Sequence, residues 1–544
     1  MKSYYKSVLA VIVISTLSCC KNSEDSKPKN DIKPLVEKKS DSGKKPDKVI
    51  PAPPTDKVVP GVWLDEKISD IVSSFENLKG ESWYGLYMFN NKVGYSVNNW
   101  KMEKSPKGPV FINTQKFHME IVNMGDKKVV EILAVLKFEG YGKGATISQE
   151  NLQTTNTESR RYVLKLNDDG KYSFSVGTGK PGEKSFKMSK PIIISEKIGG
   201  LSESELALAY KISRGKKYWK NQTVWKSRKF NYSTGGISVE TVSILNSDKI
   251  MVGGLKKVVY NIMVNTDKPK MQLKTVVDSD GSMVSGNFGP MILKREEKNI
   301  AVKLDASLDI GIMAMIKVYY KDFNPKKTDI LKIALSGPFP DVSGYNNLRY
   351  SYKKTGKTGE LTLKRDSLKG LAKVDKSKIK DPEILKFTKP DHNIESNDPV
   401  IIALADKIRK KHSDPIDQIR ATVSFVSEYV TDTMKADFDS AVMVAKEKRG
   451  DCTEHTLLTT AILRALGFPA RSVGGVGYVN LGPKNSGLGY HAWVQVWVSR
   501  WIDIDPTWNQ FPADVSHILL GTPTDLTWIS AIGSLKIEKI LEMK

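Results

Sequence analysis

A change in the spacing of apolar residues near position 390 constrains the fold more than any other feature of this 544-residue chain. Before it, short apolar runs alternate in steps of two between turn-forming residues, which is typical of antiparallel β-strands. After it, apolar residues recur every three or four positions, which is typical of helices packed on a core. The chain is therefore predicted to be α+β, with mostly antiparallel β regions before a C-terminal unit that mixes helices and strands.

The part of the chain before residue 390 is predicted to be largely β. Residues 61–320 are expected to make one or more β-rich domains that act as scaffold or substrate-docking surface, and residues 321–390 a β-rich connecting region. One helix is predicted at 202–212. Tight turns are predicted where residues that tolerate positive φ separate apolar runs, at Asn90-Asn91, Gly235-Gly236 and Asp280-Gly281. Alternation predicts that one strand face carries Val258, Tyr260, Ile262 and Val264.

Residues 391–544 are predicted to form the C-terminal unit, and its first two helices have clear start signals. Asp398-Pro399 and Asp414-Pro415 each offer an aspartate N-cap followed by a proline at the first helical position. The second helix carries an amphipathic stripe, whose apolar members are Ile416, Ile419, Val423, Val426 and Val430. The helical period therefore begins at the predicted domain boundary.

The first twenty residues are predicted to be a secretory signal peptide. A basic start, MKSYYK, precedes the apolar run SVLAVIVISTLS, which is shorter than the roughly 20 residues that span a bilayer. The following TLSCC resembles a bacterial lipobox, so Cys19 and Cys20 are the lipidation candidates; an ordinary cleaved signal is the alternative. Residues 21–60 are rich in Lys, Asp, Ser and Pro and are predicted to be a disordered tether.

Charge and cysteine content narrow the class of protein. The chain has 84 basic and 61 acidic residues, a formal charge of +23, which favours either a solvated basic surface or binding of a polyanion such as phospholipid. The lysines are scattered and no RNA-binding signature accompanies them, so no nucleic-acid partner is expected. Only Cys452 lies outside the N-terminal pair among the 3 cysteines, so a disulfide framework is not expected and Cys452 has no predicted structural partner.

Cys452 is the first candidate for chemistry. The stretch GDCTEHTLLTTAILRALGF predicts a helix that starts at or near Cys452 and ends at Gly467. A thiol at a helix start faces unpaired backbone N–H groups and the positive end of the helix dipole, and both favour the thiolate. The same N–H groups can stabilise an oxyanion. Taken alone, however, a single cysteine is more often an inert buried side chain.

A histidine and an aspartate supply the base and its support. His491 opens the strand HAWVQVWV, and the next strand is RWIDID. If the Val and Ile rows share the buried face, opposed residue numbers must sum to an even value, as in a register with Trp493 opposite Asp505 around a three-residue loop. His491 and Asp505 then lie one diagonal apart on the same face, whereas Asp503 lies farther along.

Each of these residues also has an ordinary structural interpretation: His491 as a hydrogen-bonded interior histidine, and Asp505 as a turn-forming residue before Pro506. Jointly, a cysteine at a helix start and a histidine–aspartate pair on one face form a set of nucleophile, base and orienting group. A zinc site at Cys452 and His455 is the alternative for the thiol, but no second ligand pair of suitable spacing accompanies it. No metal or cofactor is therefore expected.

Three segments together resemble the core motifs of the bacterial transglutaminase-like superfamily. They are GDCTEHTLLTTAILRALGFPARSVGG, YHAWVQVWV and WIDIDPTWNQ, with 39 residues from Cys452 to His491 (491 − 452) and 14 from His491 to Asp505 (505 − 491). The resemblance covers roughly residues 395–544. It implies a papain-like fold, with the cysteine on a helix packed against an antiparallel sheet, Cys452 as nucleophile, His491 as general base and acid, and Asp505 as the orienting group.

The resemblance implies an enzyme of the cell envelope that forms a Cys452 thioester from a peptide or glutamine carboxamide. Water would resolve it in a peptidase, and a primary amine in a transglutaminase; the sequence leaves this choice open. The implied partners are a protein or peptide substrate, such as a cell-wall peptide, and a bacterial envelope membrane reached through the lipid anchor on its periplasmic or cell-surface side. The rival is a non-catalytic envelope scaffold that retains the fold.

Overall fold

The computed structural model describes residues 67–544 apart from residues 124, 202–203, 214–223, 233–234, 306–308, 319–322, 343–348, 357, 369–378, 434–439, 481–485 and 523–524. The predicted signal peptide and tether, with Cys19 and Cys20, lie outside the described residues. In the described part of the chain, no helix combines the length and the apolar character that crossing a membrane requires.

The N-terminal half is one 15-stranded sheet in which all neighbouring strands are antiparallel, as the alternating sequence predicts. Two meanders, β1 to β8 and β10 to β15, join through the pairing of β1 with β15, and β9 adds to β7. Its strands are β1 (Gly80–Met88), β2 (Asn91–Ser105), β3 (Gly108–Asn123), β4 (Asp126–Glu139), β5 (Thr146–Thr154), β6 (Ser159–Leu166), β7 (Tyr172–Gly179), β8 (Lys187–Met188), β9 (Ile192–Ile194), β10 (Val224–Asn231), β11 (Gly236–Val252), β12 (Leu255–Asp267), β13 (Lys270–Asp278), β14 (Met283–Phe288) and β15 (Met291–Arg295).

The predicted hairpins are present in this sheet. The first turns one residue earlier than predicted, because Phe89 and Asn90 carry the positive φ values, 48° and 66°. The predicted helix at 202–212 corresponds to α4 (Glu205–Ser213). Within the described residues of this half, four further short helices accompany the sheet: α2 (Ile68–Val72), α3 (Phe75–Leu78), α5 (Lys298–Ala301) and α6 (Ile310–Ala314).

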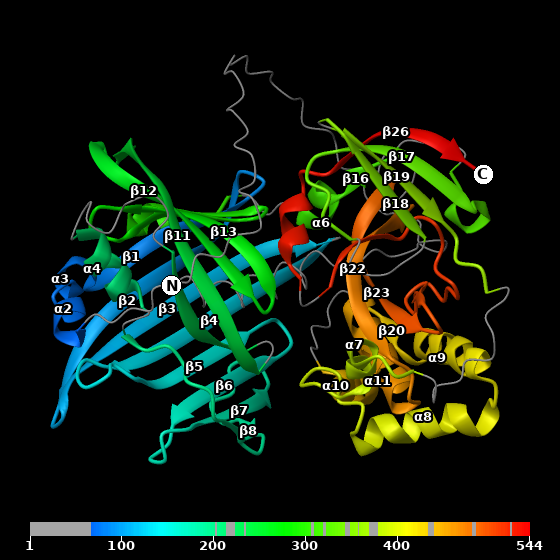
Figure 1. The fold of residues 1–544 in the computed structure, drawn as a ribbon, viewed down its shortest axis with the longest axis horizontal. Coiled ribbons are helices and arrows are strands. Elements are labelled where there is room, and N and C mark those ends of the chain that lie inside the picture. The colour runs from blue at the N-terminus through cyan, green and yellow to red at the C-terminus, as the bar shows by residue number, and fades with distance from the viewer. Residues whose placement is uncertain are drawn as a thin grey trace.

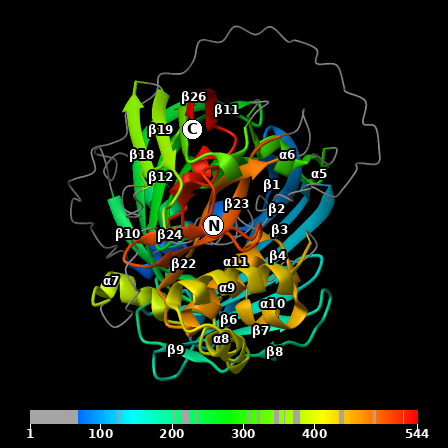
Figure 2. The ribbon, with the colours of Figure 1, turned by 90° about the vertical axis from the view of Figure 1, so that its right-hand side faces the viewer.

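The C-terminal half combines helices with two small sheets (Figures 1 and 2). One sheet has the order β16-β23-β22-β25, with β24 on β23, and the other has the order β18-β19-β17-β26. The strands are β16 (Ile316–Lys317), β17 (Ile330–Ser336), β18 (Tyr350–Thr355), β19 (Thr358–Lys364), the short parallel pair β20 (Thr431–Asp432) and β21 (Arg449–Gly450), β22 (Ala470–Val479), β23 (Gly487–Trp497), β24 (Trp501–Ile504), β25 (Ile518–Gly521) and β26 (Lys536–Met543). The helices are α7 (Pro382–Leu385), α8 (Pro399–Lys411), α9 (Pro415–Tyr429), α10 (Ala441–Glu447) and α11 (Cys452–Ala465), with 3₁₀ turns η3 (Pro325–Lys327), η6 (Lys386–Thr388) and η7 (Thr527–Ala531).

The helix starts follow the sequence signals. The Asp398 carboxylate accepts a hydrogen bond from the Val400 N–H, and Asp414 caps α9 in the same way. Helices α8 to α11 bury their apolar faces with β22, β23 and β24 in one core, which includes Leu458, Ile462, Val494, Val496, Ile502 and Ile504. The sequence-predicted Val and Ile rows therefore share the buried face.

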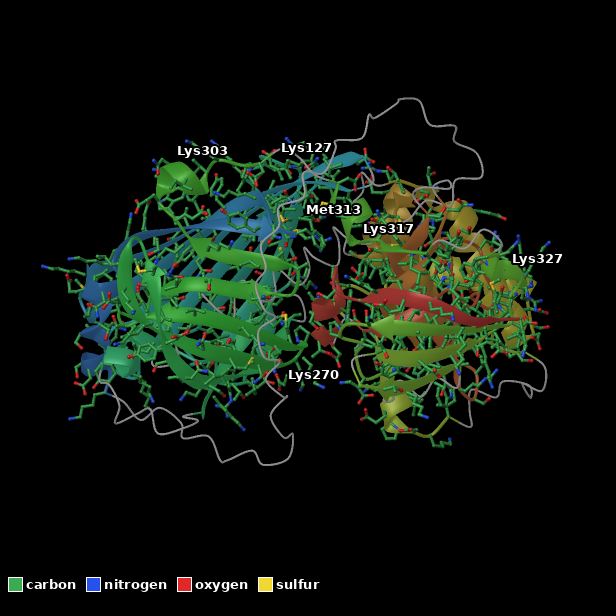
Figure 3. The ribbon with its side chains drawn as sticks, turned by 90° about the horizontal axis from the view of Figure 1, so that it is seen from above. Lys127, Lys270, Lys303, Met313, Lys317 and Lys327 are labelled. Atoms are coloured by element: carbon green, nitrogen blue, oxygen red, sulfur yellow. The ribbon has the colours of Figure 1, made fainter. Side chains whose placement is uncertain are left out.

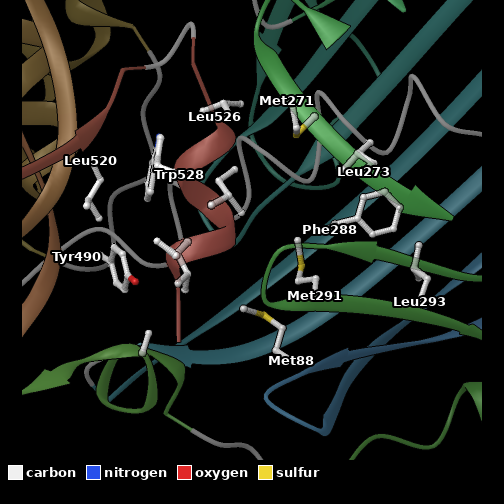
Figure 4. Packing of buried hydrophobic residues seen from close by; sticks show 14 of the residues in the cluster. Met88, Met271, Leu273, Phe288, Met291, Leu293, Tyr490, Leu520, Leu526 and Trp528 are labelled. Atoms are coloured by element: carbon white, nitrogen blue, oxygen red, sulfur yellow. The ribbon is translucent and has the colours of Figure 1, made fainter. Parts of the chain in front are cut away.

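The predicted boundary near residue 390 does not separate the sheets. Strand β26, from the predicted catalytic domain, pairs with β17 of the connecting region. The large sheet is also joined to the C-terminal half, because one hydrophobic cluster contains residues of both (Figure 4). Met88, Met271 and Met291 of the large sheet belong to it together with Trp528 of η7 and Tyr490 of β23. Thus the residue next to His491 packs in the core that joins the two halves.

Candidate active site

Cys452 is the first residue of α11 and is fully buried. Its position is set by a capping box, in which the Asp451 carboxylate accepts from the Thr453 N–H at 2.8 Å and Glu454 accepts from the Asp451 N–H at 2.7 Å. The helix start predicted from the sequence is therefore confirmed. His455 lies one turn later, and its Nδ1 is 2.7 Å from the Asp451 carbonyl oxygen, so this nitrogen is already in contact with the cap residue.

Helix α11 contacts both β22 and β23. The Arg464 Nε donates to the Ala470 carbonyl at 2.9 Å, and one turn earlier the Thr460 hydroxyl is 3.4 Å from that of Ser472. Farther along β22, Gly475 pairs with His491 of β23.

The β23–β24 hairpin has the register predicted from its buried rows. Val494 pairs with Ile504 and Trp497 with Trp501, so opposed numbers sum to 998, as they do for 493 and 505. The diagonal contact follows: the Nε2 of His491 and the Oδ2 of Asp505 are 3.0 Å apart, and both side chains are buried. The structure thus brings His491 and Asp505 together as the alternation of side chains requires.

Asp505 is held as a carboxylate by four donors. Its Oδ1 accepts from the backbone N–H groups of Thr507 and Trp508 at 2.8 and 3.3 Å, and its Oδ2 contacts His491 and His517. Burial alone would raise the pKa of Asp505, but the two histidines and their hydrogen bonds hold it well below its ordinary value. An ionised, fixed acceptor in this place selects the His491 tautomer with hydrogen on Nε2.

His517 is a member of the cluster that the sequence did not indicate. Its Nε2 is 3.0 Å from Asp505 Oδ2, and its Nδ1 is 3.2 Å from Asp514 Oδ1. Since both ring nitrogens face carboxylates, both carry hydrogen and the ring is a cation. Burial lowers the pKa of His517, but Asp505 and Asp514 together raise it to about 9. No spacing signal reveals this residue, because the loop from 505 to 517 alone brings it back to Asp505.

The ring of His491 is packed against an aromatic ring. Trp508 stacks on it with ring centroids 4.2 Å apart and an angle of 8° between the planes. Its Nδ1 is buried and, within the described part of the chain, has no hydrogen-bond partner. With hydrogen on Nε2, the neutral ring presents Nδ1 as a proton acceptor. The ring therefore has the form that a general base requires.

Gly477 makes the room for this stack. A Cβ at Gly477 would lie 2.7 Å from the Trp508 ring, whereas a Cβ at Gly474 on the same strand would meet only Trp528, at an ordinary 3.5 Å. We expect Gly477→Ala to displace Trp508 from His491, and to lower the free energy of unfolding by about 1–3 kcal/mol. Urea unfolding of both variants checks this, with Gly474→Ala as the matched control. Equal effects of the two substitutions would contradict it.

Asp503 lies on the same strand face as Asp505 but binds other residues than the two histidines. It accepts from the Gln495 amide at 2.7 Å, from Arg349 Nη1 at 3.0 Å and from the Tyr350 hydroxyl at 2.9 Å. Arg349 also donates to the Asp514 carbonyl at 2.6 Å, which fixes the loop that carries His517. Arg349 and Tyr350 of the connecting region thus hold Asp503 and the loop of His517 in place. Asp503 therefore has a structural role beside the His491–Asp505 pair.

The three side chains of His491, Asp505 and His517 also present ligand atoms within 4.8 Å of one another, a group that could hold a metal ion. In this structure the ring of His517 lies between the carboxylates of Asp505 and Asp514, so both of its nitrogens are at hydrogen-bond distance from an acid. Each nitrogen that faces Asp505 is at hydrogen-bond distance from it. The arrangement therefore fits proton transfer at His491.

Comparison with known proteins matches part of the chain to a protein superfamily. Residues 402–506 match the model of the transglutaminase-like superfamily. A protein-glutamine gamma-glutamyltransferase of Pseudomonas aeruginosa is 31% identical over 127 residues, which are 21% of this chain and 19% of that protein. An uncharacterized protein of Mycobacterium leprae is 32% identical over 91 residues, which are 15% of this chain and 31% of that protein. The matches thus span less than a third of either relative.

Solved structures resemble the chain distantly. A protein from Cytophaga hutchinsonii, provisionally described as a cysteine protease, is 16% identical, with 40% of this chain and 88% of that chain covered and a TM-score of 0.27. A TGase structure is 17% identical, with 43% and 65% covered and a TM-score of 0.17.

Proposed function

We propose that the protein is a cysteine enzyme of acyl transfer, because residues 402–506 match the model of the transglutaminase-like superfamily. Its nucleophile is Cys452, its general base and acid His491, and its orienting group Asp505. The contact between His491 and buried, ionised Asp505 is the observation that carries the proposal. The superfamily match favours a reaction at a cysteine. We also propose that α11, which carries Cys452, packs on the sheet that carries His491 in the papain-like manner.

The proposed reaction begins with proton transfer from the Cys452 thiol to His491 Nδ1. The thiolate attacks the carbonyl carbon of a carboxamide or peptide, and the carbon–nitrogen bond breaks as His491 returns the proton to the departing amine. A thioester on Cys452 and ammonia or a shortened peptide remain. The backbone N–H groups at the start of α11 are the proposed oxyanion donors. Water or a primary amine then attacks the thioester, with His491 again accepting a proton.

We propose that His517 and Asp514 keep Asp505 ionised and the hydrogen of His491 on Nε2. A cationic His517 favours the ionised form of Asp505 and leaves the Nε2 hydrogen of His491 with a fixed acceptor. Because Asp514 holds the other side of His517, the imidazole of His491 is the ring in the cluster with a nitrogen left for the thiol.

The choice between hydrolysis and crosslinking is tested by trapping. Envelope extract of the native host, supplied with a biotinylated primary amine, is incubated with the purified chain and with its Cys452→Ala variant as the control. Incorporation of the amine into protein indicates a transferase, and release of peptide fragments indicates a peptidase. If neither product exceeds that of the Cys452→Ala control, the proposed activity is wrong.

His517 gives a prediction for pH dependence. Its pKa is raised to about 9, so its stabilising contribution is complete below the ordinary value of 6.5 and is lost as pH rises through about 9. We expect His517→Gln to lower the free energy of unfolding by about 3 kcal/mol at pH 6, and by much less at pH 10. Urea unfolding at pH 6, 8 and 10 measures the difference.

The control is His412→Gln, a change of the histidine at the end of α8. A gap between wild type and His517→Gln that stays constant from pH 6 to 10 would mean that His517 is not the cation we describe.

We infer from the first twenty residues that the protein is exported and lipid-anchored in a bacterial envelope. Replacing both Cys19 and Cys20 by serine is expected to move the chain from the membrane fraction to the soluble fraction. Immunoblotting of fractionated cells measures this, with the Cys452→Ser variant as a control that keeps both candidates. Unchanged fractionation of the double variant would rule out the anchor.

A further inference from the structure

The hairpin of β11 and β12 extends beyond the strands beside it. The two strands pair with each other as far as Val252 and Leu255, at the turn. Among the described residues, β13 pairs with β12 as far as Val259 and β10 pairs with β11 as far as Ser243, where the described part of β10 begins. Among the described strands, residues 245–258 therefore pair only within the β11–β12 hairpin, and we call them the β11–β12 arm. Figure 1 shows the arm at the upper left of the large sheet.

The arm presents apolar side chains to solvent. Met251 and Leu255 are each 65% exposed, Leu245 is 49% exposed and Val258 is 37% exposed. Val258 is the one member of the sequence-predicted face that is exposed, because at its position the sheet has ended. An isolated two-stranded ribbon is marginally stable in water, so exposed apolar groups at this density indicate a surface that something covers.

Lysines accompany these apolar side chains in a regular way. Along three successive rungs of the ladder an apolar residue stands opposite a lysine: Lys249 with Val258, Ile250 with Lys257, and Met251 with Lys256. The last rung, Val252 with Leu255, is wholly apolar. Asp248 is the one acidic residue of the arm, so its net charge is +2 (three lysines and one aspartate). The tip is thus apolar and the rungs behind it are cationic.

The backbone at the tip of the arm forms a tight two-residue turn. Gly253 and Gly254 both have positive φ, 57° and 78°, as a two-residue turn between twisted strands requires. Each rung advances about 3.3 Å, so the lysines begin within about 3 to 10 Å of the apolar tip. This depth matches the layer in which an interfacial segment crosses from lipid head groups to acyl chains.

We propose that the β11–β12 arm docks on an anionic lipid surface, with Val252 and Leu255 among the upper acyl carbons and the lysines at the phosphates. The charge argues for lipid over an apolar protein groove, because three lysines next to the apolar tip would be costly to bury in such a groove and are favourable at anionic head groups. A second exposed apolar group on the described sheet, Met188, Ile192 and Ile193, lacks this rung-by-rung pairing of lysine with apolar residues. The proposal is independent of the proposed acyl transfer.

The test places a polarity-sensitive dye (NBD) on the arm. The full chain carries Cys19→Ser, Cys20→Ser and Cys452→Ala, so that Leu255→Cys is the sole thiol; a second chain carries Asp168→Cys, at the exposed β6–β7 turn, instead. Each is mixed with vesicles of 30% phosphatidylglycerol in phosphatidylcholine and with vesicles of phosphatidylcholine alone. We expect a blue-shifted, brighter emission for the arm label on the anionic vesicles, and none for the label at 168.

The charge is tested by two triple variants of equal net charge. Lys249→Gln, Lys256→Gln and Lys257→Gln together are expected to weaken binding of the arm-labelled chain to anionic vesicles by roughly a hundredfold. The control changes Lys303, Lys317 and Lys327, exposed lysines elsewhere on the molecule (Figure 3), to glutamine and is expected to change binding by less than about threefold. An arm label that stays in water on anionic vesicles overturns the proposal, and so does an equal loss in both triple variants.

Discussion

Replacing Cys452 by alanine is expected to abolish turnover, by at least about four orders of magnitude, while the fold is retained. The nucleophile has no substitute, because Cys452 is the one cysteine outside the N-terminal pair. The change removes a single buried sulfur atom at the start of α11, so the capping box of Asp451 and Glu454 stays intact. Release of ammonia or of peptide amine, with circular dichroism of the same samples, measures both halves of this expectation.

The matched control is Ile462→Val, which trims a fully buried side chain of the same helix. It is expected to lower the free energy of unfolding by about 0.5–1.5 kcal/mol and to leave turnover near that of wild type. Turnover that survives in Cys452→Ala would contradict the assignment of the nucleophile. A loss of turnover in Ile462→Val as well would show that the assay reports packing of α11.

Asp505→Asn is expected to lower mainly the catalytic rate, and Asp503→Asn mainly the free energy of unfolding. The amide introduced by Asp505→Asn cannot serve as a charged acceptor for both His491 and His517, so the base loses its tautomer and orientation, and kcat falls by about 10⁴. Asp503 instead pairs with buried Arg349 at 3.0 Å, whereas Asp366 is 3.9 Å from the same nitrogen, so Asp503→Asn removes the nearer counter-charge and lowers the free energy of unfolding by about 3–5 kcal/mol. Kinetics per folded molecule and urea unfolding separate these two outcomes.

The two aspartates are each other's control, since both are fully buried and lie two residues apart on one face of the hairpin. A fall in kcat in Asp503→Asn as large as that in Asp505→Asn would show that the orienting group has been assigned wrongly. A stable, inactive Asp503→Asn variant would exclude the supporting role that we give to its contact with Arg349.

The sequence predicts most of the site because the site is built from periodic elements. Burial of the valine and isoleucine rows leaves one family of registers for β23 and β24, and the observed pairing places His491 diagonally from Asp505. The Asp-Pro pairs set the starts of α8 and α9, and the glycine at 467 follows the end of α11. Such features depend on residues close in sequence, where the physical rules are strongest.

Features that depend on distant segments could not be predicted in this way. His517 reaches Asp505 through an irregular loop, and Arg349 reaches Asp503 across 154 positions in the chain. The pairing of β26 with β17 is likewise a contact between segments far apart in sequence. Alternation places Val258 on its strand face but does not predict its exposure, since periodicity gives the face of a residue and not where the sheet around it ends.

Thiolate absorbance at 240 nm tests the central claim, that an imidazole held by a carboxylate activates Cys452, without any choice of substrate. The signal is the difference between wild type and Cys452→Ala, which cancels the other cysteines and the tyrosines. We expect this difference at pH 6, where an ordinary thiol with a pKa of about 8.5 is almost entirely protonated, and its loss in His491→Gln. A difference that appears only above about pH 8, and that is the same with and without His491, would contradict the account.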